Sequence, residues 1–403
     1  MSHVVVIGAG QAGASCVAKL RSEGFDGQIT LIGAEPVPPY QRPPLSKAYL
    51  MGEMAQERLY LRPAAFYADN NITLRLNTKV GEIRPAEKAI VLMNGEGLAY
   101  DDLVLTTGSV PRKLPAGIGG DLSGVFTVRD LADADAMAPA FQPGKRLLVI
   151  GGGYIGLEAA AVAAKLGLQV TLVEMADRIL QRVAAPETSD YFRALHRAHG
   201  VDIREGVGLV RLTGEGHVTG AELTDGTRLA IDLAVVGIGI IPATGLAEIS
   251  GITTDNGIVT DDYGRTSDPH IWAAGDCATC NVEGQRIRLE SVGNAIDQAE
   301  AVAINIMGGD QPYVPKPWFW SDQYDCKLQI AGLNLGYGQV HVRKGEDGAQ
   351  SHWYYKGDRL IAVDAMNDAR NYMIGKRLIE GGKSPDPALI TDPATDMKAL
   401  LKL

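Results

Sequence analysis

Glycines spaced for phosphate binding occur twice in the chain. The two runs are Gly8-Ala9-Gly10-Gln11-Ala12-Gly13 and Gly151-Gly152-Gly153-Tyr154-Ile155-Gly156. In such a loop the first glycine permits a tight turn, the second lets backbone approach a pyrophosphate, and the third lets the next helix pack closely on its strand. The helix N-terminus then directs N–H groups at the phosphates. One glycine loop is weak evidence, but two of them predict that the chain binds two dinucleotides.

The elements around both loops support this prediction. An apolar strand precedes each loop, at residues 3–7 and 147–150, and an alanine-rich helical stretch follows it. A second apolar strand then leads to an acidic residue, which is Glu35 in the first case and Glu174 in the second. A carboxylate at this place can accept hydrogen bonds from a ribose diol. The sequence therefore predicts two Rossmann-like units and a redox relay between their dinucleotides.

The bulk composition is that of an acidic globular protein. The chain has 403 residues, 46% of them hydrophobic, and a net charge of −10. We expect about two or three domains at roughly 100–200 residues each. The charge argues against a nucleic-acid partner, which would favour a basic face. The first strand begins at once, and residues 147–173, the longest apolar region, are interrupted by glycines and charges, so we expect no signal peptide, no membrane span and a cytoplasmic location.

Four cysteines and seven histidines are scattered along the chain. Cys277 and Cys280 form a Cys-x-x-Cys pair, which leaves a redox-active disulfide open as an alternative. No second cysteine pair or nearby histidine completes a zinc site, and disulfides are rare in a reducing compartment. We expect no metal site and no cysteine that takes part in turnover.

The chain divides into three regions by pattern. A strand at residues 103–108 ends in small residues that let backbone approach a cofactor, and the second glycine unit extends to about residue 242. From residue 318 onward aromatic residues cluster, and the composition favours a separate α+β module. Its expected strands are residues 327–333, 339–342, 352–355 and 360–363.

With these segments in order, the chain resembles the two-dinucleotide-binding flavoproteins. More closely, it resembles the NADH-dependent ferredoxin reductases of the putidaredoxin reductase type, which serve Rieske oxygenases and bacterial cytochromes P450. The motifs that carry this resemblance are Pro43-Pro44-Leu45-Ser46-Lys47-Ala48-Tyr49-Leu50, residues 149–158, Gly275-Asp276-Cys277, Glu290-Ser291-Val292 and Pro317-Trp318-Phe319-Trp320-Ser321-Asp322-Gln323.

The resemblance implies an α/β fold with a discontinuous FAD domain (residues 1–112 and 244–317), an NAD domain (113–243) and a C-terminal α+β domain (318–403). It implies FAD and NADH as cofactors. Lys47, paired with Glu158, would lie at the flavin edge, where a cation stabilises the electron-rich reduced ring. Trp320 would lie beside the isoalloxazine and nicotinamide rings, where an indole can stack and limit access of water. These three residues are the expected catalytic residues.

Further cofactor contacts follow from the same resemblance. Asp276 would contact the ribityl chain of FAD, and Glu35 the adenosine ribose, although Ala34 occupies the family's usual acidic place. Glu174 would accept bonds from the NADH ribose and repel a 2′-phosphate, whereas Arg178 nearby could accommodate that phosphate. The full set of expected cofactor-binding residues is Gly8, Gly10, Ala12, Gly13, Glu35, Arg42, Lys47, Val80, Thr107, Gly108, Arg129, Asp276, Val292, Trp320, Gly151, Gly153, Tyr154, Ile155, Gly156, Glu158, Glu174, Arg182, Gly237, Ile238, Gly239 and Glu290.

The expected partner is a two-iron two-sulfur ferredoxin, and the resemblance favours a monomer. Lys316, Arg286 and Arg288 are candidate docking residues for such an acidic protein. The alternatives are a pyridine-nucleotide disulfide or quinone reductase and a non-enzymatic flavoprotein resembling apoptosis-inducing factor. A disulfide reductase would need a reactive cysteine beside the flavin, downstream of the first glycine loop, and this chain has no cysteine between Cys16 and Cys277. A flavoprotein resembling apoptosis-inducing factor would be expected to carry basic surfaces and a targeting segment.

Overall fold

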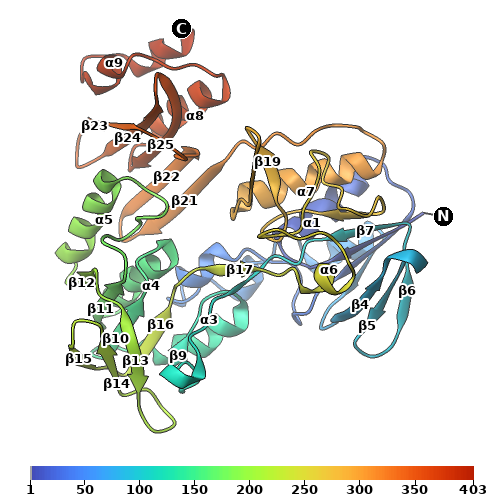
Figure 1. Cartoon of the computed structure of the whole chain (residues 1–403), viewed down its shortest axis with the longest axis horizontal. Coiled ribbons are helices and arrows are strands. Elements are labelled where there is room, and N and C mark those ends of the chain that lie inside the picture. Colours follow the sequence, from blue (N-terminus) through green and yellow to red (C-terminus); the bar gives the residue numbers. More distant parts are fainter. Residues whose placement is uncertain (1) are drawn as a thin grey trace. The chain divides into compact units, whose positions relative to one another are not determined.

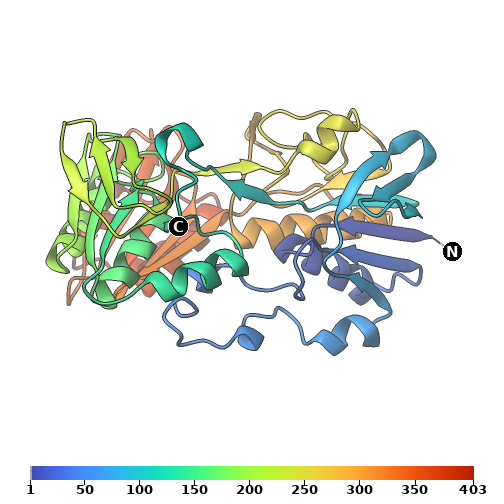
Figure 2. The ribbon, with the colours of Figure 1, turned by 90° about the horizontal axis from the view of Figure 1, so that it is seen from below.

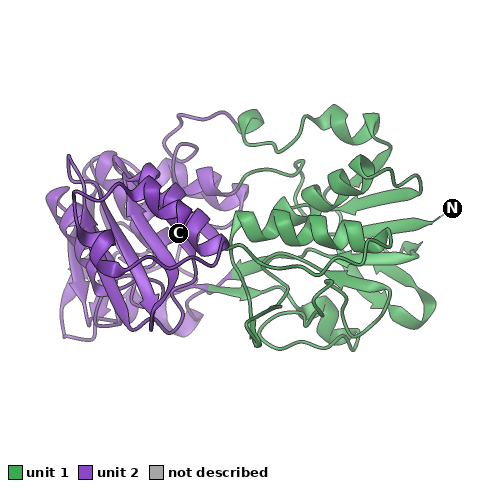
Figure 3. Cartoon of the chain, turned by 90° about the horizontal axis from the view of Figure 1, so that it is seen from above, with its two compact units in different colours: residues 1–41, 56–110, 240–317 green, residues 42–55, 111–239, 318–403 purple. Residues whose placement is uncertain are grey.

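Two compact units make up the computed structural model, which describes residues 2–403 (Figure 3). Unit 1 contains the chain up to Gln41, together with Gln56–Val110 and Ile240–Pro317. Unit 2 contains Arg42–Ala55, Pro111–Gly239 and Trp318–Leu403. No helix within residues 2–403 is long and apolar enough to cross a membrane.

A five-stranded parallel sheet of order β18-β7-β1-β2-β3 forms the centre of unit 1. Its strands are buried on both faces, as parallel strands usually are, so β1 has Val4, Val5 and Val6 fully buried. Alternate residues point to opposite faces. The strands are β1 (His3–Ile7), β2 (Gln28–Ile32), β3 (Ile72–Arg75), β7 (Asp102–Leu105) and β18 (Ile271–Ala273).

Different elements cover the two faces of this sheet. Val4 and Val6 pack against helices α1 (Gln11–Ser22) and α7 (Val292–Ile306), which lie side by side (Figure 1). Val5 and Ile7 face the small antiparallel sheet β4-β5-β6, which lies on the side away from α7 (Figure 2). The remaining elements of this part are α2 (Ala64–Asp69), β4 (Val80–Arg84), β5 (Ala89–Leu92), β6 (Gly97–Ala99), β8 (Ser109–Pro111), β17 (Ile240–Pro242), α6 (Gly245–Ile249), β19 (Cys280–Val282) and β20 (Gln285–Ile287).

Unit 2 repeats the same plan around a second parallel sheet, of order β12-β11-β10-β16-β9. One face packs on α4, and the other on the antiparallel sheet β13-β14-β15. The elements are β9 (Val125–Phe126), α3 (Leu131–Met137), β10 (Arg146–Ile150), α4 (Tyr154–Lys165), β11 (Gln169–Glu174), α5 (Pro186–Ala198), β12 (Asp202–Glu205), β13 (Leu209–Thr213), β14 (Gly220–Leu223), β15 (Arg228–Ala230) and β16 (Leu233–Val236).

The C-terminal part of unit 2 is an antiparallel five-stranded sheet of order β21-β22-β25-β24-β23 with two helices. The four strands expected from the sequence occur with shifted ends, and a fifth, β21, contains the aromatic motif. Trp353, Val363 and Ala365 face the helical side with Leu378. The elements are β21 (Trp318–Gln323), β22 (Cys326–Gly332), β23 (Gln339–Lys344), β24 (Gln350–Lys356), β25 (Arg359–Met366), α8 (Ala369–Glu380) and α9 (Pro387–Thr391).

This C-terminal sheet shares a hydrophobic core with the second parallel sheet. Cys326, Leu328 and Met366 belong to the same buried cluster as Leu157 of α4 and Phe192 of α5. The sheet therefore buries both of its faces, one under α8 and the other against α4 and α5. Residues 318–403 therefore pack within unit 2.

Candidate functional site

The glycine loop of unit 1 has the geometry of a pyrophosphate cradle. Gly8 has a φ of +115°, and a Cβ on it would lie 2.1 Å from the carbonyl oxygen of Thr106. A Cβ on Gly13 would lie 2.0 Å from the carbonyl oxygen of Gly8, so α1 can approach β1 only with glycine there. A Cβ on Gly10 would meet nothing within 4 Å, which leaves the start of α1 open to a phosphate.

The loop of unit 2 repeats these three roles. Gly151 has a φ of +106°, and a Cβ on it would lie 2.4 Å from the carbonyl oxygen of Gly237. A Cβ on Gly156 would lie 2.0 Å from the carbonyl oxygen of Gly151. Space around Gly153, the N-terminal neighbour of α4, is open. Both loops therefore fit a dinucleotide pyrophosphate, and in both the fit depends on the absence of side chains.

Glu174, at the end of β11, is tied to the second glycine loop. Its carboxylate accepts hydrogen bonds from the backbone N–H of Gly152 at 2.7 Å and from that of Ala176 at 2.8 Å. The amide of Leu180 in turn donates to the carbonyl oxygen of Gly152 at 2.9 Å. These bonds hold the carboxylate next to the loop, where a ribose bound at this sheet edge would lie.

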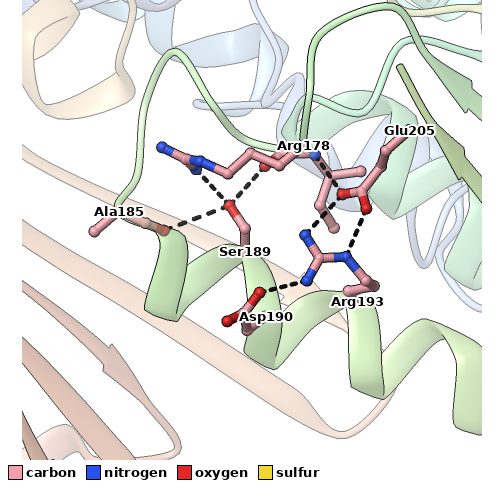
Figure 4. A network of polar contacts seen from close by, with 7 residues as sticks. Arg178, Ala185, Ser189, Asp190, Arg193 and Glu205 are labelled. Atoms are coloured by element: carbon pink, nitrogen blue, oxygen red, sulfur yellow. Dashed lines mark hydrogen bonds and ion pairs between the residues drawn. The ribbon is translucent and has the colours of Figure 1, made fainter. Parts of the chain in front are cut away.

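Arg178, the residue that left the coenzyme type open, is hydrogen-bonded to α5 and to its own loop. Figure 4 shows its guanidinium against Ser189 of α5, with a 2.5 Å hydrogen bond to Oγ, and a second bond reaches the carbonyl oxygen of Gln181. Beside it, Glu205 binds Arg193 and accepts from the backbone N–H of Ile179 at 2.8 Å. The loop after Glu174 is thus anchored on α5 and β12. Arg182, the other arginine of this loop, is exposed.

Glu158 is a buried carboxylate surrounded by donors. Its side chain, on α4, has an Oε1 atom 3.0 Å from the ammonium of Lys47. Oε1 also accepts from the Ser321 hydroxyl at 2.7 Å, and Oε2 from the Ser46 hydroxyl at 2.8 Å. Burial raises the pKa of Glu158, and the charge of Lys47 and the two hydroxyls act in the opposite direction. The structure brings together the Lys47–Glu158 pair expected from the sequence.

Lys47 also faces two residues of β21. Its ammonium lies 3.5 Å from the Asp322 carboxylate and 6.0 Å from the centroid of the Trp320 ring. Trp320 stacks on Trp318 with ring centroids 5.5 Å apart. Phe319, on the other face of the strand, contacts Tyr154 of the glycine loop. The three expected catalytic residues, Lys47, Glu158 and Trp320, therefore form one cluster in unit 2.

Several residues of this cluster had no role expected from the sequence. Ser46, Ser321 and Asp322 lie within the quoted motifs, but nothing in the motifs shows which atoms they contact. Gln323, the last residue of β21, is buried and donates to Ser321 at 3.1 Å. The signal available was the alternation of strand residues, which places Ser321 and Gln323 on one face.

The Gly-Asp motif of unit 1 lies at the end of β18. Gly275 has a φ of +82°, and the carboxylate of Asp276 accepts from the Ser109 hydroxyl at 2.9 Å. Nearby, Thr107 donates to the carbonyl oxygen of Ala243 at 2.6 Å. These contacts order the loops that follow two neighbouring parallel strands, β7 and β18. Ligands bind at this carboxyl edge in open α/β sheets.

The other expected contacts occupy defined places. Glu35 accepts from the Tyr40 hydroxyl at 2.5 Å, and Arg42 donates to the carbonyl oxygen of Arg129 at 2.8 Å. Glu290 pairs with Arg288 at 2.6 Å. Val292 begins α7, Val80 begins β4, and Gly237, Ile238 and Gly239 follow β16.

Arg288 is a poor docking residue. Its guanidinium donates to the carbonyl oxygens of Asn256 and Asp276 and pairs with Glu290, and its side chain is only 9% exposed. Among the three docking candidates, only Arg286 and Lys316 are exposed. Arg286 and Lys316 are therefore the accessible candidates, because the charge of Arg288 is used within unit 1.

All four cysteines are buried, free thiols. The Sγ atom of Cys277 lies 3.4 Å from the carbonyl oxygens of both Leu105 and Ala274, either of which can accept its one proton. Burial raises the pKa of Cys16 to about 12 and those of Cys280 and Cys326 to about 11. A thiol in this state is a poor nucleophile. Within residues 2–403, no group of three or more His, Cys, Asp or Glu side chains could hold a metal ion.

Two parallel sheets, each with its glycine cradle, define the class of proteins that bind two dinucleotides. The comparisons agree. Residues 2–299 match the family of pyridine nucleotide-disulphide oxidoreductases, and residues 318–401 match the C-terminal domain of reductases.

The ferredoxin–NAD(P)(+) reductase fdr of Sphingomonas sp. is 45% identical to this chain, over 98% of it and 96% of that protein. Putidaredoxin reductase CamA of Pseudomonas putida is 41% identical, with 99% and 96% covered. A crystal structure of a covalent putidaredoxin reductase–putidaredoxin complex matches with a TM-score of 0.96 at 41% identity, and covers 100% of this chain and 98% of the other. The chain belongs to the pyridine nucleotide-disulphide oxidoreductases, and among them to the ferredoxin reductases, flavoenzymes that use FAD and NAD(H).

Proposed function

We propose that the chain passes electrons from NADH through FAD, one at a time, to a two-iron two-sulfur ferredoxin that serves an oxygenase. The observation that carries this proposal is the ion pair of partly buried Lys47 with buried Glu158, in a chain with two open glycine cradles. A flavin accepts two electrons as hydride and releases them singly, which matches NADH to a one-electron acceptor.

The proposed division of labour follows the two sheets. Residues 1–112 and 244–317 would bind FAD, with the phosphates at Gly10 and the ribityl chain at Asp276. Residues 113–243 would bind NADH at Gly153 and Glu174. Residues 318–403 would supply Trp320 and the surface for the acceptor. In support, a Cβ placed on Gly10 or on Gly153 would meet nothing within 4 Å, so both loops leave room for phosphates.

In this proposal Lys47 holds a positive charge at the flavin edge. Glu158 keeps the ammonium in place, because the carboxylate is itself held by Ser46 and Ser321. Such preorganised charge costs no rearrangement during the reaction. Trp320 would shield the rings from water, and its contact with Lys47 supports that placement.

NADH, rather than NADPH, is the proposed donor. Glu174 presents a negative charge where a 2′-phosphate would lie, and Arg178 is bound to Ser189 instead. A 2′-phosphate near that carboxylate would be repelled.

The proposed partner is an acidic two-iron two-sulfur ferredoxin, bound by a monomer of this chain, with no nucleic acid or membrane involved. The test is NADH oxidation with purified acceptors under identical conditions: ferredoxins from the same genome, a rubredoxin, a quinone, a disulfide and oxygen. A ferredoxin should give the highest kcat/KM. Faster turnover with a rubredoxin, quinone or disulfide would refute the proposed acceptor, while reduction of bound FAD by NADH tests the donor side separately.

A further inference from the structure

A continuous series of hydrogen bonds runs from Glu158 to Gln323, the last residue of β21, and on to His196 of α5. Ser321 contacts Glu158 at 2.7 Å, Gln323 contacts Ser321 at 3.1 Å, and the Nε2 atom of His196 lies 2.8 Å from Gln323 Oε1. The side chains of Ser321, Gln323 and His196 are at most 1% exposed. These four residues, and Tyr324 as the next member, all belong to unit 2.

The direction of the chain follows from its hydrogens. Ser321 has one proton and gives it to Glu158, so its oxygen accepts from the amide nitrogen of Gln323. Oε1 of Gln323 then faces His196, and the Nε2 atom of His196 must carry a proton. Every member donates toward Glu158. A chain of this polarity stabilises a negative charge at its end, since each bond polarises the next.

His196 is suited to this single arrangement. Burial lowers its pKa to about 4, so the ring is neutral near pH 7 and has one donor and one acceptor nitrogen. With the proton on Nε2, the Nδ1 atom accepts from the Tyr324 hydroxyl, 3.2 Å away. Tyr324 itself is stacked under the exposed ring of His199, with ring centroids 3.7 Å apart.

The turn after β21 brings Tyr324 to this place. Gln323 pairs with Cys326 in the hairpin, so only two residues connect β21 and β22. Tyr324 has a φ of +57°, which is uncommon for a residue other than glycine. Its contacts with His196 and His199 hold this conformation, and the turn thereby closes the outer end of the chain.

We propose that Gln323 and His196 are positioning residues that act through Ser321 to keep Glu158 ionised and aligned on Lys47. Loss of any member removes stabilisation of the carboxylate, and protonated Glu158 no longer holds the Lys47 charge. The kinetic consequence rests on the proposed function, in which Lys47 lies at the flavin. The proton arrangement in the chain does not rest on it.

The kinetic experiment measures flavin reduction by NADH in the FAD-loaded protein by stopped flow, from pH 6 to pH 9. The variants are Ser321→Ala, Gln323→Leu and His196→Leu, and the conservative variants are Ser321→Thr and His196→Gln, which keep a donor. The charged groups around the site are Lys47, which pairs with Glu158, and Asp322, which lies against Lys47, and both remain in every variant.

The rate relative to wild type should depend on pH. For Ser321→Ala the ratio at pH 6 should be lower than at pH 9 by up to about tenfold, because loss of one hydrogen bond to the carboxylate raises the pKa of Glu158 by roughly one unit. Gln323→Leu and His196→Leu should lower the rate ratio in the same direction, with about half the logarithmic change between pH 9 and pH 6, because these residues act on Glu158 through their neighbours. Ser321→Thr and His196→Gln should restore the wild-type profile. The inference is overturned if the ratios for Gln323→Leu and His196→Leu are independent of pH.

His352→Leu is the matched control. His352 is also a buried histidine of unit 2, with a pKa lowered to about 4, but it contacts Thr188 at 2.7 Å and not the Glu158 chain. This variant should lose stability without a change in the pH dependence of flavin reduction. A shift equal to that of His196→Leu would show that general loosening, not the chain, is responsible, and would overturn the inference.

A second measurement uses no turnover. Nitrogen NMR of the FAD-loaded protein with labelled histidine should show His196 as a neutral ring with its proton on Nε2, assigned by loss of the signal in His196→Gln. A proton on Nδ1 would overturn the direction of the chain. If wild-type protein failed to transfer hydride from NADH, the proposed function would fail, and this measurement would still decide the chain.

Discussion

The carboxylate of Glu174 accepts a 2.7 Å hydrogen bond from the backbone N–H of Gly152, and this bond joins the end of β11 to the second glycine loop. We expect Glu174→Ala to lower kcat/KM for NADH by roughly tenfold or more, because a hydrogen bond to a charged group contributes about 1.5–3 kcal/mol. The kcat/KM for NADPH should fall less than that for NADH, because the substitution also removes the carboxylate charge that repels the 2′-phosphate. The exposed Asp177 in the same loop provides the control, and Asp177→Asn should leave the ratio unchanged. Wild-type preference for NADPH would contradict this role of Glu174.

Removal of Lys47 should leave a buried, unpaired carboxylate. We expect Lys47→Met to lower the free energy of unfolding by about 3 kcal/mol, because breaking one partner of a buried pair is costly. The double variant Lys47→Met with Glu158→Gln should recover most of that loss. Reduction of FAD by NADH should be slow in both. Urea unfolding and stopped-flow reduction measure the two effects.

Lys165 provides the matched control for this prediction. Lys165 lies on α4, the helix that carries Glu158, and forms an ion pair with Glu53. Both side chains of this pair are more than half exposed. Lys165→Met should change stability by less than about 1 kcal/mol. Similar losses for Lys47→Met and Lys165→Met would show that burial of the Lys47 pair has no energetic role.

A variant with all four cysteines changed to serine should still bind FAD and reduce ferricyanide with NADH. The thiols are buried, and Cys277 is bonded to backbone oxygens. A lower Tm is expected, since hydroxyls replace thiols in apolar surroundings. Thiol titration of the native wild-type protein should show no fast-reacting group. Loss of flavin reduction in a folded, FAD-loaded variant would show that a cysteine takes part in turnover.

The two buried histidines should make the protein less stable in acid. The pKa values of His196 and His352 are lowered to about 4, below the value of about 6.5 in an unfolded chain. Between these values the unfolded state binds more protons, so stability is lost as pH falls from about 6.5 to about 4, by about 3 kcal/mol per histidine at most. Urea unfolding from pH 7 to pH 4.5 should show a shallower loss for His196→Gln and His352→Gln. An unchanged slope would mean that the pKa values of the two rings are the same in the folded and the unfolded protein.

Ferredoxin docking should depend on Arg286 and Lys316, the exposed candidates. The double variant Arg286→Glu with Lys316→Glu should raise KM for ferredoxin and leave the ferricyanide rate unchanged. Added salt should reduce the difference, because the screening length falls from about 10 Å at 0.1 M to about 3 Å at 1 M. Arg211→Glu with Arg228→Glu, at two arginines of unit 2 that are 54% and 80% exposed, gives the same change in net charge and is the control. Equal effects of the two double variants would argue against a local docking site.

Much of this protein could be predicted from its sequence alone. Glycine at positions 8, 13, 151 and 156 is required by the local backbone or by close approach, and such requirements leave a readable pattern. The apolar runs before and after each glycine loop predicted both parallel sheets, because strands that are buried on both faces consist mostly of apolar residues. The motifs around Lys47 and Trp320 also indicated the ferredoxin reductase family before any contact was known.

Only the tertiary structure decided which groups act together. Ser46 and Ser321 meet at Glu158 from positions more than a hundred residues away along the chain, and His196 reaches that carboxylate through Gln323. Likewise, the sequence placed Arg178 near the coenzyme acid, whereas folding directs it to Ser189. Side-chain direction and long-range packing have no local pattern, because they depend on how separate elements share one core. That shared core is also why the C-terminal sheet is part of unit 2.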